Sequence, residues 1–372
     1  MLIAAMTKDD TMETAEVAKS LLVRETQEGD FSILHDFPPC DIEKAWRDCL
    51  SRVESPAHYN SPEFFLEPYW AGKRPFAVLA WDGGKVIGIL TGLHEGDCVI
   101  SGLQSRPQIC IDRTADPTEA MGGLARGLLT ESRSARLVSV YSWSCMPLDS
   151  FESYGFRRRE LEGNVVLDLT RNSEVLFKEL NKKRRTNIRS AIRNGIDVFP
   201  AATPEDTATF YHIYRAWRQT TRKTISGDEI SWPVFEQRFQ QPENFRFFLA
   251  RHSGNVIAGI TLRFFAGGLV EYSNNSSLDQ FLNLRPNDLL VWRAIEWASS
   301  QGFQRFSLGG AHRFLREFGG EVVSIWRYRL DRTLLRQHDL QQAVQDAARS
   351  SFRKFPHPVQ KTVRRLLGKK EL

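Results

Sequence analysis

The chain contains two similar stretches that lie 170 residues apart. Residues 79–88 read LAWDGGKVIG and residues 249–258 read LARHSGNVIA, so that five of the ten positions are identical and 249 − 79 = 170. Each stretch has an apolar run, a polar turn with glycine and a second apolar run, a pattern that predicts a β-hairpin. A hairpin repeated at this distance predicts that the chain holds two copies of one folding unit.

Further landmarks recur near the same offset. Pro117 and Pro286 each open a segment with a helical pattern, and proline suits the first turn of a helix because its missing N–H is not needed there. Each segment leads to a strand-like run, a turn with an aromatic residue and glycine, and another strand. These runs are RLVSVYSW (136–143), SYGF (153–156) and VVLDL (165–169) in the first copy, and RFSLGG (305–310), EFGG (317–320) and SIWRYRL (324–330) in the second.

The order of these elements predicts an α/β fold of mixed sheets. We expect a first unit in residues 1–170, a second in residues 171–333 and a basic helical tail in residues 334–372. The chain of 372 residues is long enough for two domains of ordinary size. Its hydrophobic fraction of 41% and charged fraction of 26% are typical of a globular protein.

The remaining bulk features concern location and function class. Five cysteines include no CxxC pair, which favours a reducing compartment. The segment MLIAAMTKDDTMETAEVAK lacks the apolar core of a signal peptide, and no stretch approaches about 18 apolar residues. We therefore expect a cytoplasmic protein, with contact at the inner face of the membrane as an option. The motifs GxxxxGK[ST], GxSxG and HExxH are absent, and His94, Cys98 and Cys110 are too weak a pattern to predict a metal site.

The order of the motifs resembles the duplicated acetyltransferase-like (GNAT) architecture of the FemABX peptidyltransferases and their acyltransferase relatives. RRTNIRSAIRNGIDV (184–198) is similar to the basic helix of that family. Residues 275–310 resemble its proline-started helix followed by a strand that ends in Gly-Gly, and FLREFGGEVV (314–323) resembles its closing turn. The resemblance implies two tandem GNAT-like domains that transfer an acyl or aminoacyl group to an amine.

Two departures from the family pattern leave the acyl donor open between acyl-CoA and aminoacyl-tRNA. Members that use charged tRNA tend to have Phe-Lys in the closing motif, whereas Leu315 follows Phe314 here. Acetyl-CoA enzymes have a glycine loop that holds the pyrophosphate, whereas this chain has Arg285-Pro-Asn-Asp288. We expect the acceptor amine to belong to a cell-envelope or polysaccharide precursor. The alternative is a non-catalytic module that binds an anionic glycan or a lipid-linked precursor.

A basic run marks residues 176–199, where Lys182 to Arg193 include six basic and no acidic residues. Net charge is only +5, so positive potential must come from such clusters. On a helical wheel Arg184 falls in the apolar stripe, so it either pairs with a carboxylate, reaches an anionic ligand or extends to solvent. The family pattern falls on Arg185 and Arg189, and we take all three arginines as candidate substrate-binding residues. A solvated face and contact with charged tRNA are the alternatives.

A candidate reaction centre follows from GGLVEYSNNSS (267–277), which predicts a strand ending in polar groups. In the resembling fold the central strands separate here, and donor and acceptor meet in the gap. Aminolysis needs a proton acceptor and a donor to the oxyanion. The candidate catalytic residues are Glu271, Tyr272 and Asp288, and the further candidate substrate-binding residues are Asn274, Arg285, Asn287, Gly309 and Gly310. Each also has a structural interpretation: solvent contact, core packing, a helix-dipole partner or a plain turn.

The tail supplies the last candidate surface. Val359, Val363, Leu366 and Leu367 follow helical spacing within the basic segment 351–372. This pattern predicts a short basic amphipathic helix, which suits an anionic membrane surface, a partner protein or the second domain of the chain itself.

Overall fold

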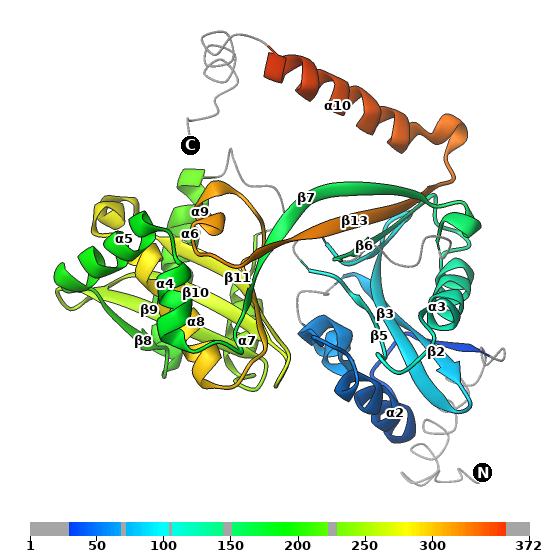
Figure 1. The fold of residues 1–372 in the computed structure, drawn as a ribbon, viewed down its shortest axis with the longest axis horizontal. Coiled ribbons are helices and arrows are strands. Elements are labelled where there is room, and N and C mark those ends of the chain that lie inside the picture. The colour runs from blue at the N-terminus through cyan, green and yellow to red at the C-terminus, as the bar shows by residue number, and fades with distance from the viewer. Residues whose placement is uncertain (1–29, 68–71, 104–105, 144–150, 222–228, 355–372) are drawn as a thin grey trace, which may run out of the picture.

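The structure, a computed structural model, describes residues 30–67, 72–103, 106–143, 151–221 and 229–354. In this part of the chain, thirteen strands form one mixed sheet through both halves of the molecule (Figure 1). From one edge to the other they are β1 (Phe31–Leu34), β2 (Arg74–Asp82), β3 (Lys85–Glu95), β4 (Cys98–Ser101), β6 (Leu137–Ser142), β13 (Glu321–Asp331), β7 (Arg157–Asp168), β12 (Arg305–Ser307), β11 (Leu269–Ser277), β10 (Asn255–Phe264), β9 (Phe245–His252) and β8 (Asp197–Pro200), and β5 (Ile109–Ile111) pairs with β3. The predicted α/β class with a mixed sheet is confirmed.

The two halves have the same strand order. In the first half, strands β1 to β4 are followed by α3 (Pro117–Glu131) and by β6, which lies parallel to β4. In the second half, strands β8 to β11 are followed by α8 (Pro286–Ser300) and by β12, which lies parallel to β11. Both helices start at the predicted prolines, and parallel neighbours need such a crossover. The duplication predicted from the repeated hairpin is confirmed.

Two long strands cross between the halves, as Figure 1 shows. Strand β13 comes late in the sequence, yet its residues Trp326–Asp331 pair with β6 of the first half. Strand β7 ends the first half of the sequence, yet its residues Val166–Asp168 pair with β12 of the second half. Each half of the sheet is therefore completed by a strand from the other half of the sequence. The domain boundary predicted after Thr170 follows β7 and stays a prediction.

Helices cover both faces of the sheet in the second half. Leu290 and Ile295 of α8 pack with Leu262 and Phe306 on one face. On the other face, aromatic side chains of two further helices pack on Phe247. These two helices are α6 (Pro204–Thr221) and α7 (Trp232–Phe239). The other α-helices of the described residues are α2 (Cys40–Ser51), α4 (Ser173–Glu179), α5 (Lys182–Arg193), α9 (Arg313–Arg316) and α10 (Gln337–Lys354).

The basic segment forms two helices, α4 and α5, so its treatment as one continuous helix is wrong. The break follows from Asn181, whose side chain accepts a hydrogen bond of 2.9 Å from the backbone N–H of Lys183 and caps α5. The side chains expected on the apolar stripe, Leu180, Arg184 and Ile188, are nevertheless buried. Helical geometry resumes after two non-helical residues, Leu180 and Asn181.

The tail begins with α10, which Figure 1 shows apart from the two sheet halves. Ion pairs join Arg157 to Asp339 at 3.8 Å and Arg159 to Asp346, and they fasten α10 to β7. The basic amphipathic helix predicted around Val359 lies outside the described residues. None of the helices within the described ranges combines the length and the apolar composition that crossing a membrane requires.

Candidate active site

Strands β11 and β12 separate in the middle of the second half. They run parallel from Leu269 and Arg305 as far as Glu271 and Ser307. Beyond that point β11 continues along β10 to Ser277, whereas the chain after β12 turns toward β7, with Leu308 N donating to Val165 O at 2.9 Å. The gap expected from the resemblance therefore lies just after Glu271.

Glu271 and Tyr272 face opposite sides of the sheet. Tyr272 lies opposite Leu262 and packs with it in the core beneath α8. Glu271 lies opposite Arg263, whose Nε donates to Glu271 Oε2 at 2.7 Å on the other face. Neighbouring residues of a strand alternate in this way. The two predicted catalytic groups of β11 therefore act in different layers of the fold.

A row of polar side chains crosses the sheet where the strands separate. Glu271 pairs in register with Ser307, and the Oγ of Ser307 accepts a hydrogen bond of 2.8 Å from Asn164 Nδ2 on β7. Glu271 is only 3% exposed, yet its Oε1 has no hydrogen-bond partner among the described residues, and neither has the Oδ1 of Asn164. A buried acceptor without a donor costs about 1–3 kcal/mol. Both oxygens are therefore places where water or the N–H of a substrate gains a hydrogen bond.

The first half of the chain closes over this row. Arg263 donates to Tyr59 Oη at 2.7 Å, and its guanidinium carbon lies 3.9 Å from the centre of the Tyr59 ring. Tyr59 in turn donates to Glu67 at 3.0 Å, and Arg238 of α7 donates to Glu67 Oε1 at 3.0 and 3.1 Å. Burial alone would raise the pKa of Glu67, but Arg238 and Arg263 outweigh it and lower that pKa. This buried network joins the two halves at the candidate site.

Tyr272 borders the gap from the α8 side. It is half-buried, and burial raises the pKa of its phenol although a hydrogen bond with Asn275 opposes the shift. Its hydroxyl therefore stays protonated at neutral pH and can donate. Gly309 follows β12 with a φ of +76°, and a Cβ there would stand 3.3 Å from the carbonyl oxygen of Tyr272. Glycine thus suits both the turn and the close approach of the two backbones.

Asn274 and Gly310 lie on the two edges of the gap. Asn274 sits opposite Thr261 on β10, and its Nδ2 is buried without a partner among the described residues. Its Oδ1 accepts from Ser276 Oγ at 3.3 Å. The carbonyl of Gly310 accepts from Val165 N at 2.9 Å, so Gly310 holds β7 against the chain after β12. Of these groups, the Asn274 amide is the one available to a ligand oxygen.

Arg184 lies in a buried ion-pair cluster between α5, α8 and the turn after α9. It is 6% exposed, and its guanidinium contacts Asp288 of α8 and Glu317 after α9, the latter at 2.8 Å. The guanidinium carbon also lies 4.0 Å from the ring centre of Phe314. Asn187 Nδ2 donates to Asp288 at 3.0 Å. Among the alternatives left open by the sequence, the structure supports pairing with carboxylates of the protein itself.

The N-terminus of α8 does not fit the pyrophosphate of CoA. Pro286 supplies no N–H, and the buried carboxylate of Asp288 in the first turn would repel another anion. Arg313 also pairs with Glu317, at 3.2 Å, so that two arginines balance the two carboxylates of this cluster. Arg285 precedes the helix with a φ of +67° and an exposed side chain, and Asn287 Nδ2 donates to Ser277 Oγ at 3.1 Å. A CoA diphosphate has no cradle at this helix.

Arg185 and Arg189 lie on the outer side of α5. Arg185 donates to the carbonyls of Lys178 and Leu180, at 2.5 and 2.6 Å, and ties α4 to α5. The guanidinium carbon of exposed Arg189 lies 5.4 Å from the ring centre of Phe177. Both arginines border an open groove of about 670 Å³ between α4, α5 and α8. Because α8 covers the sheet face opposite Glu271, this groove lies on that side of the molecule.

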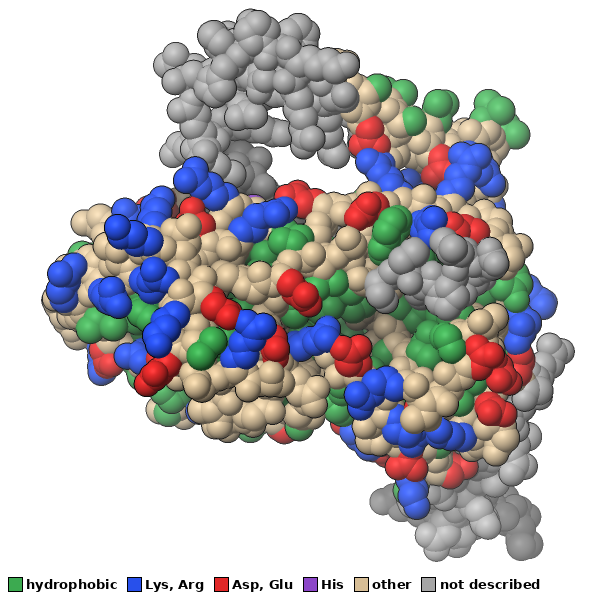
Figure 2. Space-filling view, in the orientation of Figure 1, with side chains coloured by type: hydrophobic (Ala, Val, Ile, Leu, Met, Phe, Trp, Pro, Cys, Tyr) green, Lys and Arg blue, Asp and Glu red, His purple; other side chains and the backbone are tan. Residues whose placement is uncertain are grey.

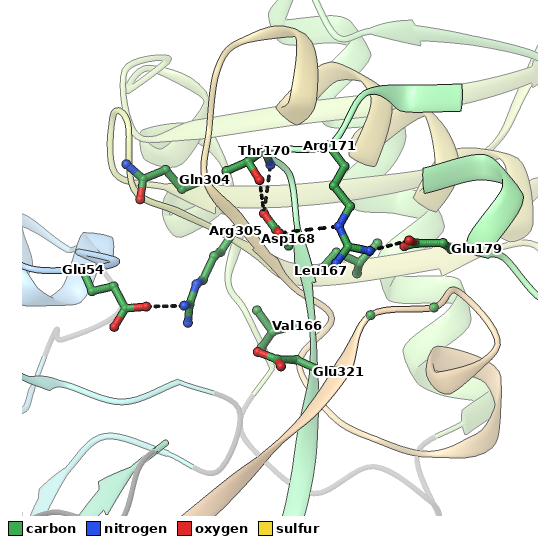
Figure 3. Close-up of a pocket in the computed structure, with 12 residues that line it drawn as sticks. Glu54, Val166, Leu167, Asp168, Thr170, Arg171, Glu179, Gln304, Arg305 and Glu321 are labelled. Carbon is green, nitrogen blue, oxygen red and sulfur yellow. Dashed lines mark hydrogen bonds and ion pairs between the residues drawn. The ribbon is translucent and has the colours of Figure 1, made fainter. Parts of the chain in front are cut away.

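A polar cavity of about 670 Å³ lies where β7, β12 and β13 meet (Figure 3). Arg305 pairs there with Glu54 of the first half, and Arg171 pairs with Glu179. Exposed Glu321 makes no ion pair with the described residues. The residues that line the cavity are Glu54, Val166, Leu167, Asp168, Thr170, Arg171, Glu179, Gln304, Arg305, Gly319, Gly320 and Glu321.

This cavity adjoins the polar row. Val166 lines it and pairs in register with Ser307. Arg305 precedes Ser307 by two residues on β12, so the two side chains lie on the same face of the sheet. A substrate that enters the cavity would therefore approach Glu271 from the side of β7.

The polar row and the network that closes over it include residues that the sequence did not single out. Arg263 lies in the run ITLRFF and Asn164 in the run GNVV. A charged or amide residue in an apolar strand needs a partner when it is buried, and this signal could have identified both. Tyr59 and Glu67 lie in HYNSPEFFLE, where no periodic pattern marks them.

Within the described ranges, no three His, Cys, Asp or Glu side chains are placed to hold a metal ion. His94, part of the weak pattern noted above, instead contacts Glu131 Oε1 at 2.6 Å. That contact accounts for its position without a metal.

Comparison with protein families identifies one domain. Residues 182–321 match the family model of an acetyltransferase (GNAT) domain. This range contains α5, the hairpin of β9 and β10, and the strands β11 and β12 that separate at Glu271. None of the curated proteins is similar enough in sequence to match this chain.

Several solved structures have the same fold at low sequence identity. FemX is 12% identical with a TM-score of 0.62, over 81% of this chain and 98% of FemX. The C-terminal domain of a protein assigned as a lysylphosphatidylglycerol synthetase from Agrobacterium fabrum is 14% identical with a TM-score of 0.58, over 82% of this chain and 95% of that domain. A tandem GNAT protein from the clavulanic acid biosynthesis pathway is 11% identical with a TM-score of 0.52, over 82% of this chain and 99% of that protein.

Proposed function

We propose that this chain, which has the duplicated GNAT-like fold of the FemABX acyltransferases, is an N-acyltransferase that uses the gap after Glu271. One observation carries the proposal: a buried carboxylate oxygen that has no donor among the described residues lies where the central strands β11 and β12 separate. Ser307 and Asn164 extend this polar row toward an open cavity. A carboxylate at such a place can take a proton from an amine that attacks an acyl carbon.

The proposed reaction needs few groups. The amine nitrogen attacks the acyl carbon, a C–N bond forms, and the bond from carbon to the leaving oxygen or sulfur breaks. Glu271 Oε1 takes the proton that nitrogen loses, and the leaving group takes up a proton as it departs. The amide of Asn274, which lies on the same face of the sheet as Glu271, donates to the oxyanion. Asn164 Oδ1 is placed to accept a second N–H and to orient the amine.

The donor is proposed to be an acyl-CoA or an aminoacyl-tRNA. Pro286 and the buried carboxylate of Asp288 disfavour a CoA diphosphate at the N-terminus of α8. A CoA donor would therefore have to bind elsewhere on the protein. Leu315 occupies the place of the lysine that tRNA-dependent relatives tend to have. Both donor classes therefore belong in the first experiment.

The acceptor is proposed to be an amine on a cell-envelope, polysaccharide or lipid-linked precursor, modified in the cytoplasm or at the inner membrane face. The lysylphosphatidylglycerol synthetase among the structural relatives is named for a lipid product, which supports a lipid-linked acceptor. The anionic character of such precursors fits the exposed basic side chains of α5. The same fit supports the alternative, a non-catalytic module that binds an anionic precursor.

The test is an assay of donor consumption. The full chain would be incubated with acetyl-CoA, longer acyl-CoA thioesters or charged tRNA, each with a panel of amino sugars, amino acids and aminolipids. We expect one pairing to give an amide product that mass spectrometry detects. If the folded protein consumes no donor above background with any pairing, while it still binds an anionic precursor, the binding-module alternative takes its place.

A further inference from the structure

The outer face of α4 and α5 has positive charges that the protein does not compensate. Five exposed basic side chains make no ion pair with any carboxylate of the described residues. They are Lys178, Lys182, Lys183, Arg189 and Arg193, and we call them the α5 basic face. Figure 2 shows Lys and Arg side chains gathered at this end of the molecule.

Several basic residues elsewhere on the surface have acidic partners. Arg47 pairs with Glu43 at 2.8 Å, Lys73 with Glu95 at 2.7 Å, and Arg251 with Asp197 at 2.7 Å. Lys182 to Arg193 include no acidic residue, so no partner is available along α5. A dense set of unpaired like charges raises the energy of the isolated protein, and an anionic partner relieves it.

Apolar groups accompany these charges. Ile192 of α5 is 49% exposed, one turn after Ile188 and beside Arg189 and Arg193. It lines the open groove of about 670 Å³, whose floor includes Phe177. Cations around an exposed aliphatic side chain and an apolar groove match the boundary between lipid headgroups and acyl chains.

We infer that the α5 basic face docks on an anionic lipid bilayer, with Ile192 inserted at the headgroup boundary. The cations would lie against headgroup phosphates, and the groove beside Phe177 would shelter apolar atoms of a lipid. RNA fits this face less well. Binding of single-stranded RNA commonly uses exposed aromatic rings for stacking, whereas the exposed apolar side chain of α5 is the aliphatic Ile192. The inference does not depend on the proposed catalysis.

The test is co-sedimentation of the full chain with vesicles. One set contains phosphatidylcholine alone, and the other contains about one third phosphatidylglycerol, with low and physiological salt compared. We expect binding to the anionic vesicles only, weakened by salt. The variant K182A/K183A/R189A/R193A should lose at least about tenfold in affinity, and Ile192→Ser should weaken the binding that persists at higher salt.

A matched control removes four exposed basic residues of the first half, K44A/R113A/R133A/R136A, and should bind as the wild type does. Equal binding by the α5 variant and the wild type would overturn the inference, as would an equal loss in the control. It would also be overturned if the wild type ignored both vesicle types but bound bulk tRNA through the same four residues. Far-UV circular dichroism confirms that each variant is folded.

Discussion

Ile87 and Ile257 occupy the same bulge in their two hairpins, and 257 − 87 = 170. Ala80 pairs with Gly88 and Trp81 with Val86, so Ile87 is the extra residue of β3. In the second hairpin Ala250 pairs with Ala258 and Arg251 with Val256, so Ile257 is the extra residue of β10. A bulge increases the local twist of a strand. The two units therefore share an irregularity as well as a strand order.

The hairpin turns give the first prediction. Gly84 and Gly254 have φ of +82° and +80°, and a Cβ at either position would meet no atom within 4 Å. Gly84→Ala and Gly254→Ala should each lower the free energy of unfolding by about 1–2 kcal/mol, because only left-handed backbone strain is involved. Urea denaturation measures both. Effects that differ by more than about 1 kcal/mol would show that the two turns are not equivalent.

The buried cluster around Arg184 gives the second. Arg184→Ala leaves Asp288 and Glu317 without their cation, so it should lower the free energy of unfolding by about 3–5 kcal/mol. Arg189→Ala removes an exposed guanidinium of the same helix and should cost less than about 0.5 kcal/mol. Urea denaturation of both variants provides the comparison. An Arg184→Ala protein of normal stability that no longer binds substrate would instead assign Arg184 to the ligand.

The unpartnered oxygen of Glu271 gives the third. Glu271→Gln keeps an acceptor for Arg263 but cannot take a proton, so kcat should fall by about 10²–10⁴-fold once a substrate pair is known. Glu321→Gln neutralises an exposed carboxylate of the neighbouring cavity and should leave kcat within about threefold. Thermal unfolding of both variants separates lost catalysis from lost folding. Full activity of Glu271→Gln would remove Glu271 as the proton acceptor.

The pH dependence of stability gives the fourth. Burial, with a smaller contribution from Arg263, lowers the pKa of His58 to about 3. As pH falls below about 6.5, His58 becomes protonated in the unfolded chain but stays neutral in the folded protein. The free energy of unfolding therefore decreases by about 1.4 kcal/mol per pH unit. Stability from His58 is therefore complete above pH 6.5 and is lost toward pH 3. Carboxylates with lowered pKa, such as Glu67, act only below about pH 4.5.

Urea denaturation between about pH 4.5 and 6.5 excludes the carboxylates, and the His58→Phe variant separates the contribution of His58 from that of His312, whose pKa burial also lowers. His58→Phe should flatten the decrease, since the ring already packs 5.3 Å from Phe245 across the halves. His212→Gln changes an exposed histidine and should retain the slope of the wild type. A decrease of equal slope in His58→Phe would place the acid-sensitive group elsewhere.

Much of the fold could be predicted because the landmarks of one copy have counterparts at nearly the same offset in the other. Pro117 and Pro286 mark two helix starts correctly, since proline acts on the local backbone whatever its surroundings. The exchange of β7 and β13 could not be predicted, because a strand pattern does not say which neighbour the strand will choose. Length alone could have raised the question, because VVLDL is only the last part of β7, which begins at Arg157.

Only part of the candidate site could be predicted from the sequence. Glu271 and Tyr272 were placed together by their position in the sequence, but alternation along a strand sends adjacent side chains to opposite faces. Asp288 was predicted as a catalytic group, and the structure pairs it with Arg184 in a buried cluster. Partners from the first half, such as Tyr59, depend on how the two units meet, and no local pattern contains that information.

The crossing of β13 into the first half also has a consequence for synthesis. While the ribosome is still translating the second unit, the first unit lacks the strand that covers the free edge of β6. Its sheet can close only after Asp331 has left the exit tunnel, so the nascent chain passes through a long interval with an exposed strand edge. A chaperone would be most needed during that interval. Residues 1–170 expressed alone would keep the unpaired edge of β6 and would therefore tend to aggregate.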